Sequence, residues 1–223
     1  FRRVLFRSDA VTGARAVPIH QSTSFVFDSA DHAASLFNLQ TFGNVYSRLS
    51  NPTVAVLEER VAALEGGRAA VASASGMAAE AMALMTILQA GDHVVAAGAL
   101  YGGSVTMLSV NLKKFGITTA FADITRPDSF AAAMRPETRA VFVESLGNPS
   151  LALADLAALA DIAHAHGVPL VVDNTVPSPA LCNPIAFGAD IVVHSATKYL
   201  GGHGTTLAGV VVESGKFPWD NGR

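Results

Sequence analysis

The fold is decided by residues 191–204, which read IVVHSATKYLGGHG. We expect the apolar start of this stretch to be a buried strand, and its polar part to lie in the loop that leaves the strand's carboxyl end. That loop offers the hydroxyls of Ser195 and Thr197, which could hold a phosphate, and the amine of Lys198. A lysine amine can condense with an aldehyde, and burial favours the neutral form that this reaction needs. Taken alone, Lys198 is better read as a strand-end side chain that reaches solvent, so its neighbours decide.

Outward from this stretch, short apolar runs alternate with longer segments rich in alanine and leucine. The alternating segments are 69–73, 77–89, 93–97, 104–115, 118–122, 129–134, 140–144, 153–165, 170–173 and 191–194. Such alternation predicts an α/β fold with a three-layer, doubly wound and mostly parallel sheet, whose ligands bind where loops leave the carboxyl ends of the strands. Residues 207–213 are predicted to form a further, antiparallel strand.

The N-terminal part is organised differently. Residues 17–50 lack a sustained helical or strand period and predict an extended arm. A helix is expected from Pro52, which suits a first turn, to the stop at Gly66-Gly67. Its expected apolar face consists of Val56, Leu57, Val61 and Leu64. The predicted organisation is therefore an arm over residues 1–50 and a large domain over residues 51–223, which is incomplete at its C-terminal end.

The first residues fit neither segment. Residues 2–8, RRVLFRS, are basic and short and lack the apolar stretch and cleavage site of a signal peptide. Our hypothesis is that they are a translated sequencing adaptor or cloning scar, and a genomic read that encodes the same residues across this junction would refute it.

Composition narrows the class of protein. Half of the 223 residues are hydrophobic, 15% are charged and the formal net charge is -3, so no electrostatic footprint for nucleic acid or an anionic membrane is expected. The single cysteine, Cys182, cannot form an internal disulfide, and no second thiol completes a cysteine metal site. No apolar run is long enough to span a bilayer. We expect a cytoplasmic enzyme that acts on small molecules and has no metal.

Two further strand ends supply groups that suit a phosphorylated cofactor. Asp173 ends an apolar strand 25 residues (198 - 173) before Lys198. A carboxylate beside the ring nitrogen of pyridoxal phosphate (PLP) keeps that nitrogen protonated. Ser75-Gly76-Met77 ends another strand and opens a helix, where backbone N–H groups can bind phosphate. Each has a plainer reading, because Asp173 could be a turn residue and Ser75 an ordinary helix cap.

Six motifs together resemble the cysteine/methionine-metabolism family of fold-type I PLP enzymes. They are Val45-Tyr46-Ser47-Arg48 with Asn51-Pro52-Thr53, Ser75-Gly76-Met77-Ala78, Tyr101-Gly102-Gly103, Asn148-Pro149, Asp173-Asn174-Thr175 and Ser195-Ala196-Thr197-Lys198-Tyr199. The resemblance runs from about Val17 to the last residue. It implies that the large domain is the PLP-binding domain of this fold type.

The resemblance also implies roles for single residues. Lys198 would form the Schiff base with PLP, Asp173 would partner the pyridinium nitrogen, and Tyr101 would stack on the ring and assist proton transfer. The phosphate would be bound by Ser75, Gly76, Met77, Ser195 and Thr197, and Asn148 would hydrogen-bond the ring oxygen. Plainer alternatives stay open, since Tyr101 could be a packed loop aromatic and Asn148 a turn former before Pro149.

The arm motif implies an assembly. By the resemblance, Tyr46 and Arg48 would reach the phosphate of a neighbouring subunit, which implies a homodimer or homotetramer with shared active sites. Arg48 could instead be a surface charge. Members of the family also have a smaller C-terminal domain with an arginine that clamps the substrate carboxylate, and this chain ends before that domain.

Residues 198–206 with Gly215-Lys216-Phe217 and Trp219, and residues 42–46, resemble the O-acetylhomoserine sulfhydrylases within this family. The implied reaction is a γ-replacement in methionine biosynthesis, in which O-acetyl-L-homoserine and sulfide or a small thiol give L-homocysteine or a thioether and acetate. Lys198, displaced by the substrate amine, would remove the Cα proton as a mobile base.

Three alternatives remain open. A cystathionine γ-synthase or a γ- or β-lyase shares the cofactor machinery. A catalytically silent PLP-fold fragment would form no covalent cofactor adduct. A nucleotide-binding module fits poorly, because a P-loop places its glycines before the lysine, whereas Gly201-Gly202-His203-Gly204 follow Lys198.

Overall fold

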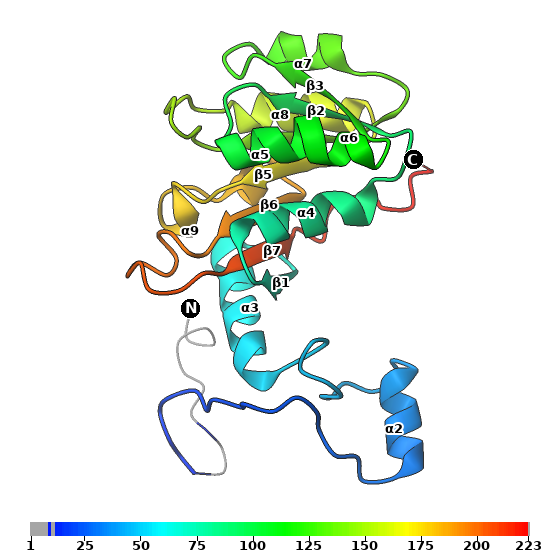
Figure 1. The fold of residues 1–223 in the computed structure, drawn as a ribbon, viewed down its shortest axis with the longest axis vertical. Helices are drawn as coiled ribbons and strands as arrows, with labels where there is room; N and C mark the ends of the chain where they lie inside the picture. The colour runs from blue at the N-terminus through cyan, green and yellow to red at the C-terminus, as the bar shows by residue number, and fades with distance from the viewer. Residues whose placement is uncertain (1–8, 10–11, 223) are drawn as a thin grey trace. The chain divides into compact units, whose positions relative to one another are not determined.

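The computed structural model describes residue 9 and residues 12–222. The hypothesis of a cloning scar at residues 2–8 lies outside the described part of the chain. The protein divides into two compact units between Arg60 and Val61. This division lies within a helix, α3 (Pro52–Glu65), whose two ends therefore belong to different units (Figure 1).

The N-terminal unit contains a helix where the sequence predicts only an irregular arm. Helix α2 covers Ala30–Phe37. It begins at Ser29, whose side chain accepts a hydrogen bond from the N–H group of His32 at 3.0 Å. The prediction of an irregular arm is wrong here, because a good N-cap and a buried Leu36 stabilise two turns that are too short to show a sustained period.

The second unit is built on a seven-stranded sheet. Its strands are β1 (Ala69–Ser73), β2 (His93–Ala97), β3 (Thr118–Ala122), β4 (Thr138–Glu144), β5 (Leu170–Asp173), β6 (Ile191–Ser195) and β7 (Gly209–Glu213), in the order β1-β7-β6-β5-β4-β2-β3. Strands β3, β2, β4, β5 and β6 pair in parallel, and β7 pairs antiparallel with both β6 and β1. The predicted mostly parallel sheet and its antiparallel last strand are confirmed.

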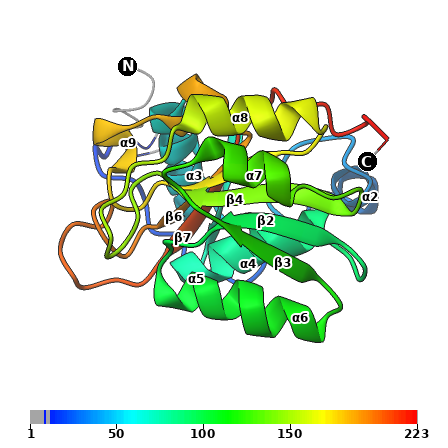
Figure 2. The same cartoon turned by 90° about the horizontal axis from the view of Figure 1, so that it is seen from above.

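Helices cover both faces of this sheet. One face carries α4 (Gly76–Ile87), α5 (Gly102–Thr106) and α6 (Leu112–Lys114), and the other carries α7 (Pro127–Ala133) and α8 (Leu156–Ala165), as Figure 2 shows. Two short helices, α9 (Ser178–Leu181) and the 3₁₀ helix η2 (Pro184–Phe187), follow β5. The predicted three-layer architecture is confirmed. None of the helices in the described residues is long and apolar enough to cross a membrane.

Two predicted helices differ in detail. The segment 104–115 is interrupted by a π-helical turn, η1 (Met107–Asn111), between α5 and α6. The C-terminal end of α3 buries Val61, Ala62 and Glu65, whereas Leu64, expected on the buried face, is 47% exposed. Glu65 is only 1% exposed, and its carboxylate makes hydrogen bonds to buried side chains that are described below.

Candidate active site

A cavity of about 250 Å³ lies where β4, β5 and β6 end and α4 begins. Its walls include most of the side chains that the sequence singled out. These are Ser75, Gly76, Met77, Tyr101, Asn148, Asp173, Ser195, Thr197 and Lys198. A wider depression of about 890 Å³ shares Asn148, Thr197 and Lys198 with it and adds the glycine-rich turn after Lys198. The structure thus brings together residues from five separate segments of the chain.

The turn before α4 is held tightly against the end of β6. Ser75 caps the helix, and its side chain accepts a hydrogen bond from the N–H group of Ala78 at 3.1 Å. Gly76 is required there, because a Cβ atom at this position would lie 2.6 Å from Cβ of Ser195. The close packing places the first N–H groups of α4, which have no acceptor within the helix, beside the Ser195 hydroxyl. Such a helix start favours an anion.

Asp173 ends β5 and faces the same cavity. Its Oδ1 accepts a hydrogen bond from the N–H group of Thr175 at 2.8 Å, and Thr175 Oγ1 in turn accepts one from the N–H group of Ser195 at 2.8 Å. Burial raises the pKa of Asp173, while Thr175 and the charge of His194 act in the opposite direction. A cation in the cavity would stabilise the ionised form of Asp173.

Lys198 lines the same cavity from the turn after β6. Its N–H group donates to the carbonyl of Ser195 at 3.1 Å, which turns the chain sharply after the strand. The hydroxyl of Thr197 bridges to Ala208, accepting from its N–H group at 3.1 Å. Lys198 is exposed, so the burial that would favour its neutral form is not provided by this chain in the turn.

Glu144 was not identified from the sequence, yet it organises one wall of the cavity. It ends β4, is 6% exposed, and accepts hydrogen bonds from the N–H groups of Tyr101 at 2.5 Å and Asn148 at 2.8 Å. Burial raises the pKa of Glu144, and these two hydrogen bonds oppose the shift. A carboxylate at the carboxyl end of a buried strand was an available signal, identical to the one that identified Asp173.

Glu80 is the second residue that sequence reasoning missed. It lies one helical turn after Gly76 on α4 and lines the cavity while remaining 3% exposed. Its Oε1 accepts a hydrogen bond from Ser104 Oγ at 2.9 Å. The sequence contains a signal for this role, because the i, i+4 spacing of Glu80 from Gly76 places both residues on the same helix face.

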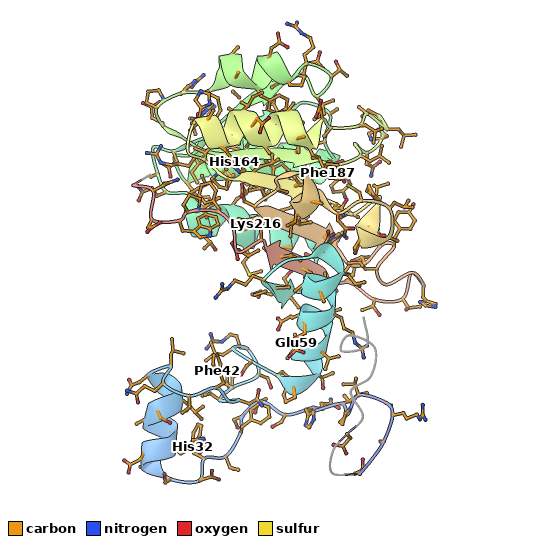
Figure 3. All side chains as sticks on the ribbon, turned by 180° about the vertical axis from the view of Figure 1, so that it is seen from behind. His32, Phe42, Glu59, His164, Phe187 and Lys216 are labelled. Atoms are coloured by element: carbon orange, nitrogen blue, oxygen red, sulfur yellow. The ribbon has the colours of Figure 1, made fainter. Side chains whose placement is uncertain are left out.

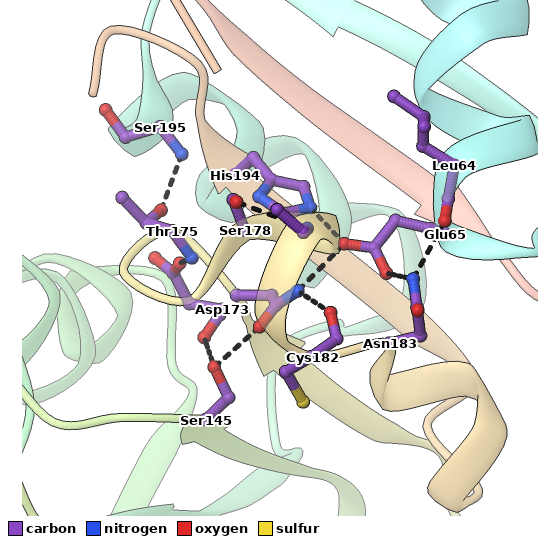
Figure 4. A network of polar contacts seen from close by, with 12 residues as sticks. Leu64, Glu65, Ser145, Asp173, Thr175, Ser178, Cys182, Asn183, His194 and Ser195 are labelled. Atoms are coloured by element: carbon purple, nitrogen blue, oxygen red, sulfur yellow. Dashed lines mark hydrogen bonds and ion pairs between the residues drawn. The ribbon is translucent and has the colours of Figure 1, made fainter. Parts of the chain in front are cut away.

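A buried polar network lies at the ends of β4, β5 and β6, next to the cavity, and is shown in Figure 4. His194 Nε2 lies 2.6 Å from Glu65 Oε1, and neither side chain is accessible to solvent. Glu65 Oε1 also accepts a hydrogen bond from Asn174 Nδ2 at 2.9 Å, and Asn174 Oδ1 accepts one from Ser145 Oγ at 2.8 Å. The network links α3 to the ends of β4, β5 and β6, and so fixes the strand ends that carry the cavity.

Tyr46 and Arg48 belong to the N-terminal unit. Within that unit the guanidinium carbon of Arg48 lies 5.5 Å from the centre of the Tyr46 ring. This is the spacing of a cation–π pair. The two side chains therefore contact each other, and their predicted role at a neighbouring subunit stays a prediction.

A second cavity, of about 490 Å³, lies at the opposite ends of the strands. Its walls include His164 and Lys216, which Figure 3 labels in the view from behind. His164 Nε2 lies 2.8 Å from Asp190 Oδ2, and the same oxygen accepts a hydrogen bond from the N–H group of Leu170 at 2.8 Å. These contacts join α8 to the starts of β5 and β6, which is a structural role.

The donor set of the first cavity fits PLP. The start of α4 with Ser195 matches a phosphate, Lys198 matches an aldehyde, and the half-buried Asp173, whose pKa is raised by burial, matches the positive charge of a pyridinium. The aromatic ring of Tyr101 closes one side of the cavity and is half exposed, so it can pack on a planar ligand.

Known proteins match this chain closely. The model of the family "Cys/Met metabolism PLP-dependent enzyme" matches residues 3–222. An O-acetyl-L-homoserine sulfhydrylase of Leptospira meyeri is 54% identical over 96% of this chain and 49% of its own length, and a homocysteine synthase of Schizosaccharomyces pombe is 52% identical over 95% and 49%. The chain thus spans about half the length of the curated relatives it matches.

Solved structures agree with this match. A Campylobacter jejuni protein described as an O-acetylhomoserine (thiol)-lyase, with a pyridoxyl-lysine monophosphate, superposes with a TM-score of 0.92 at 42% identity, over 96% of this chain and 53% of that one. A cystathionine γ-lyase of Lactobacillus plantarum gives a TM-score of 0.86 at 38% identity, over 93% and 52%. With the fold, the cavity and the family model in agreement, the chain belongs to the Cys/Met metabolism family of PLP-dependent enzymes.

Proposed function

We propose that the complete protein containing this chain transfers the four-carbon unit of O-acetyl-L-homoserine to sulfide or a small thiol, giving L-homocysteine or a thioether and acetate. The observation that carries this proposal is the convergence of Lys198, Asp173 and the Ser75-Gly76 turn on one cavity. The choice of substrate rests on the names of relatives such as those of Leptospira meyeri and Schizosaccharomyces pombe. The reaction places the protein in the biosynthesis of methionine.

The residues that line the cavity have different roles in the proposed reaction. When bound, PLP supplies an aldehyde for imine formation and a ring that accepts electrons from a substrate carbanion. Lys198 supplies the amine that holds the cofactor and, once displaced, takes the proton from Cα of the substrate. Asp173 would lie beside the ring nitrogen and keep it protonated, because a positive charge would stabilise the Asp173 carboxylate, whose pKa is raised by burial.

The remaining groups bind and orient. The N–H groups of Gly76 and Met77 at the start of α4 and the hydroxyls of Ser75, Ser195 and Thr197 would hold the phosphate. Tyr101 packs on the ring and assists proton transfer, and Asn148 donates to the ring oxygen. Glu144 positions both of them, since it accepts hydrogen bonds from the two backbone N–H groups.

The assembly and location follow as further parts of the proposal. Tyr46 and Arg48 would complete the phosphate site of a neighbouring subunit, so the active form would be a homodimer or homotetramer. The ligands are small amino acids. The single cysteine suits a reducing compartment, and we place the protein in the cytoplasm.

The test is a product assay of the complete protein with O-acetyl-L-homoserine and either sulfide or cysteine as the acceptor. We expect homocysteine and acetate in equal amounts with sulfide, and a much slower reaction with cysteine. Faster formation of cystathionine from cysteine would favour a cystathionine γ-synthase, and thiol release from cystathionine without an acceptor would favour a lyase. No turnover with any of these substrates would contradict the proposal.

A further inference from the structure

Two acidic side chains from adjacent layers, the sheet and helix α4, meet in the active-site cavity. Asp173 reaches it from the end of β5, and Glu80 reaches it from the first turns of α4. Glu80 is 3% exposed. The Oε1 atom of Glu80 accepts a hydrogen bond from Ser104. Its Oε2 atom is buried, and among the described residues no partner lies at hydrogen-bonding distance and angle. A buried, unpartnered carboxyl oxygen is costly unless it carries a proton or gains a partner.

The surroundings of Glu80 favour its protonated form. Burial and the charge of Asp173 are the main causes that raise the pKa of Glu80 to about 8, and Ser104 opposes the shift. Glu144 adds a smaller effect of the same sign. Two carboxyl groups in one buried site do not both ionise readily, so one of them holds a proton at neutral pH.

No cation among the described residues lowers the pKa of Glu80, although Lys198 lines the same cavity. The titratable side chains that line the cavity are Glu80, Tyr101, Glu144, Asp173 and Lys198. His194 on β6 acts on Asp173, and its own partner is Glu65. Helix α5 contributes the uncharged Ser104, and Glu213, the charged residue of β7, lies at the strand end away from Gly209 and the cavity. The contact between the two carboxyl groups raises the pKa of Glu80 and lowers that of Asp173, so Glu80 is the member of the pair that holds the proton.

We infer that Glu80 is a positioning residue that acts through Asp173: its neutral carboxyl group donates a hydrogen bond to the Asp173 carboxylate, and the pair presents a single negative charge to the ring nitrogen of PLP. The effect on PLP rests on the function proposed above, whereas the proton on Glu80 does not. One charge on the pair matches the one positive charge of a protonated pyridine ring. Ionisation of Glu80 would add a second negative charge and would remove the hydrogen bond that Glu80 donates to Asp173.

The protonation of the Glu80 carboxyl group is tested in the absence of the cofactor. Infrared difference spectra of the complete, cofactor-free protein are compared with those of Glu80→Gln at neutral and alkaline pH. We expect a carbonyl band of a protonated carboxyl group in the wild type, lost with a midpoint near 8 and absent from Glu80→Gln. Glu137→Gln, which removes an exposed carboxylate, serves as the matched control and should keep the band. A wild-type spectrum without a band that depends on Glu80 would overturn the inference.

The effect on the cofactor is tested by absorbance and PLP affinity across the same pH range. Glu80→Gln keeps a neutral donor, so we expect its affinity at neutral pH to match the wild type and its spectrum to lose the transition near 8. Glu80→Ala lacks the donor and should bind PLP about tenfold more weakly. An unchanged transition in Glu80→Gln would overturn the role at the cofactor. Failure of Lys198→Ala to abolish covalent PLP would instead count against the proposed function, while the infrared band still reports on Glu80.

Discussion

His194 Nε2 lies 2.6 Å from Glu65 Oε1, and both side chains are completely shielded from water. The pair joins the end of α3 to β6 directly before the turn that carries Lys198. A buried polar contact of this kind adds little net stability, but removal of one partner leaves the other without a hydrogen-bond partner. The contact therefore fixes the position of the strand end more than it stabilises the fold.

We predict that Glu65→Ala lowers the free energy of unfolding by about 3 kcal/mol or more, because His194 and Asn174 each lose a buried acceptor. Glu65→Gln keeps one acceptor oxygen and should cost less. Denaturant unfolding of the three proteins measures the difference, with the exposed Glu137→Ala as a control. Equal stability of Glu65→Ala and the control would show that the pair is dispensable.

Gly209, the first residue of β7, packs closely against the backbone of Ser75 in the turn before α4. A Cβ atom on Gly209 would lie 2.0 Å from the carbonyl oxygen of Ser75, so alanine must displace either β7 or the turn. We predict that Gly209→Ala weakens PLP binding by tenfold or more, in line with a loss of about 1.4 kcal/mol. Gly102→Ala, with open space at its Cβ position, is the matched control. Equal PLP affinity of the two variants would show that the turn can shift without loss.

Glu144 holds the Tyr101 and Asn148 loops through two backbone hydrogen bonds. A glutamine has one acceptor oxygen, and its amide would oppose the second N–H donor. We expect Glu144→Gln to weaken PLP binding by roughly tenfold while the protein stays folded, as lost hydrogen bonds to a charged group predict. Fluorescence titration with PLP measures the affinity and circular dichroism the fold. An unchanged affinity would mean that the two loops hold their positions unaided.

The pH dependence of stability follows from Glu80. Its pKa is raised from 4.5 to about 8, so the folded state binds this proton more tightly than the unfolded state. The free energy of unfolding must then fall as pH rises through this window, and the stabilisation is complete only below it. In Glu80→Gln this contribution is absent, so the variant should lose less thermal stability between these pH values. Parallel melting curves of the wild type and the variant across the window would contradict this assignment.

The sequence was sufficient for the sheet because most strands are short apolar runs, and several of them, such as β4, β5 and β6, end in a polar residue. That same pattern identified Asp173, Ser75 and Lys198, whose positions on strand ends bring them into one cavity. Glu80 was missed because α4 is apolar on most sides, so periodicity does not reveal which face looks into the cavity. Glu65 was missed because its partners come from residues more than a hundred positions away.

Exposure was the other property that sequence could not supply. The apolar strand before Lys198 does not reveal the exposure of this residue, because Ala196 directly after the strand is buried whereas Lys198 in the following turn is exposed. Helix α2 was missed for a different reason, because its two turns depend on the cap at Ser29 and on the single buried residue Leu36. Such local stabilisation leaves no long period to recognise.

The account depends most directly on which lysine holds the cofactor. The complete protein is incubated with PLP, reduced with borohydride, digested and analysed by peptide mass spectrometry. Of the four lysines in this chain, Lys113, Lys114, Lys198 and Lys216, only Lys198 should carry the pyridoxyl group, and Lys198→Ala should carry none at the corresponding peptide. A stoichiometric adduct on another lysine, or an unmodified Lys198 in protein saturated with PLP, would contradict the assignment.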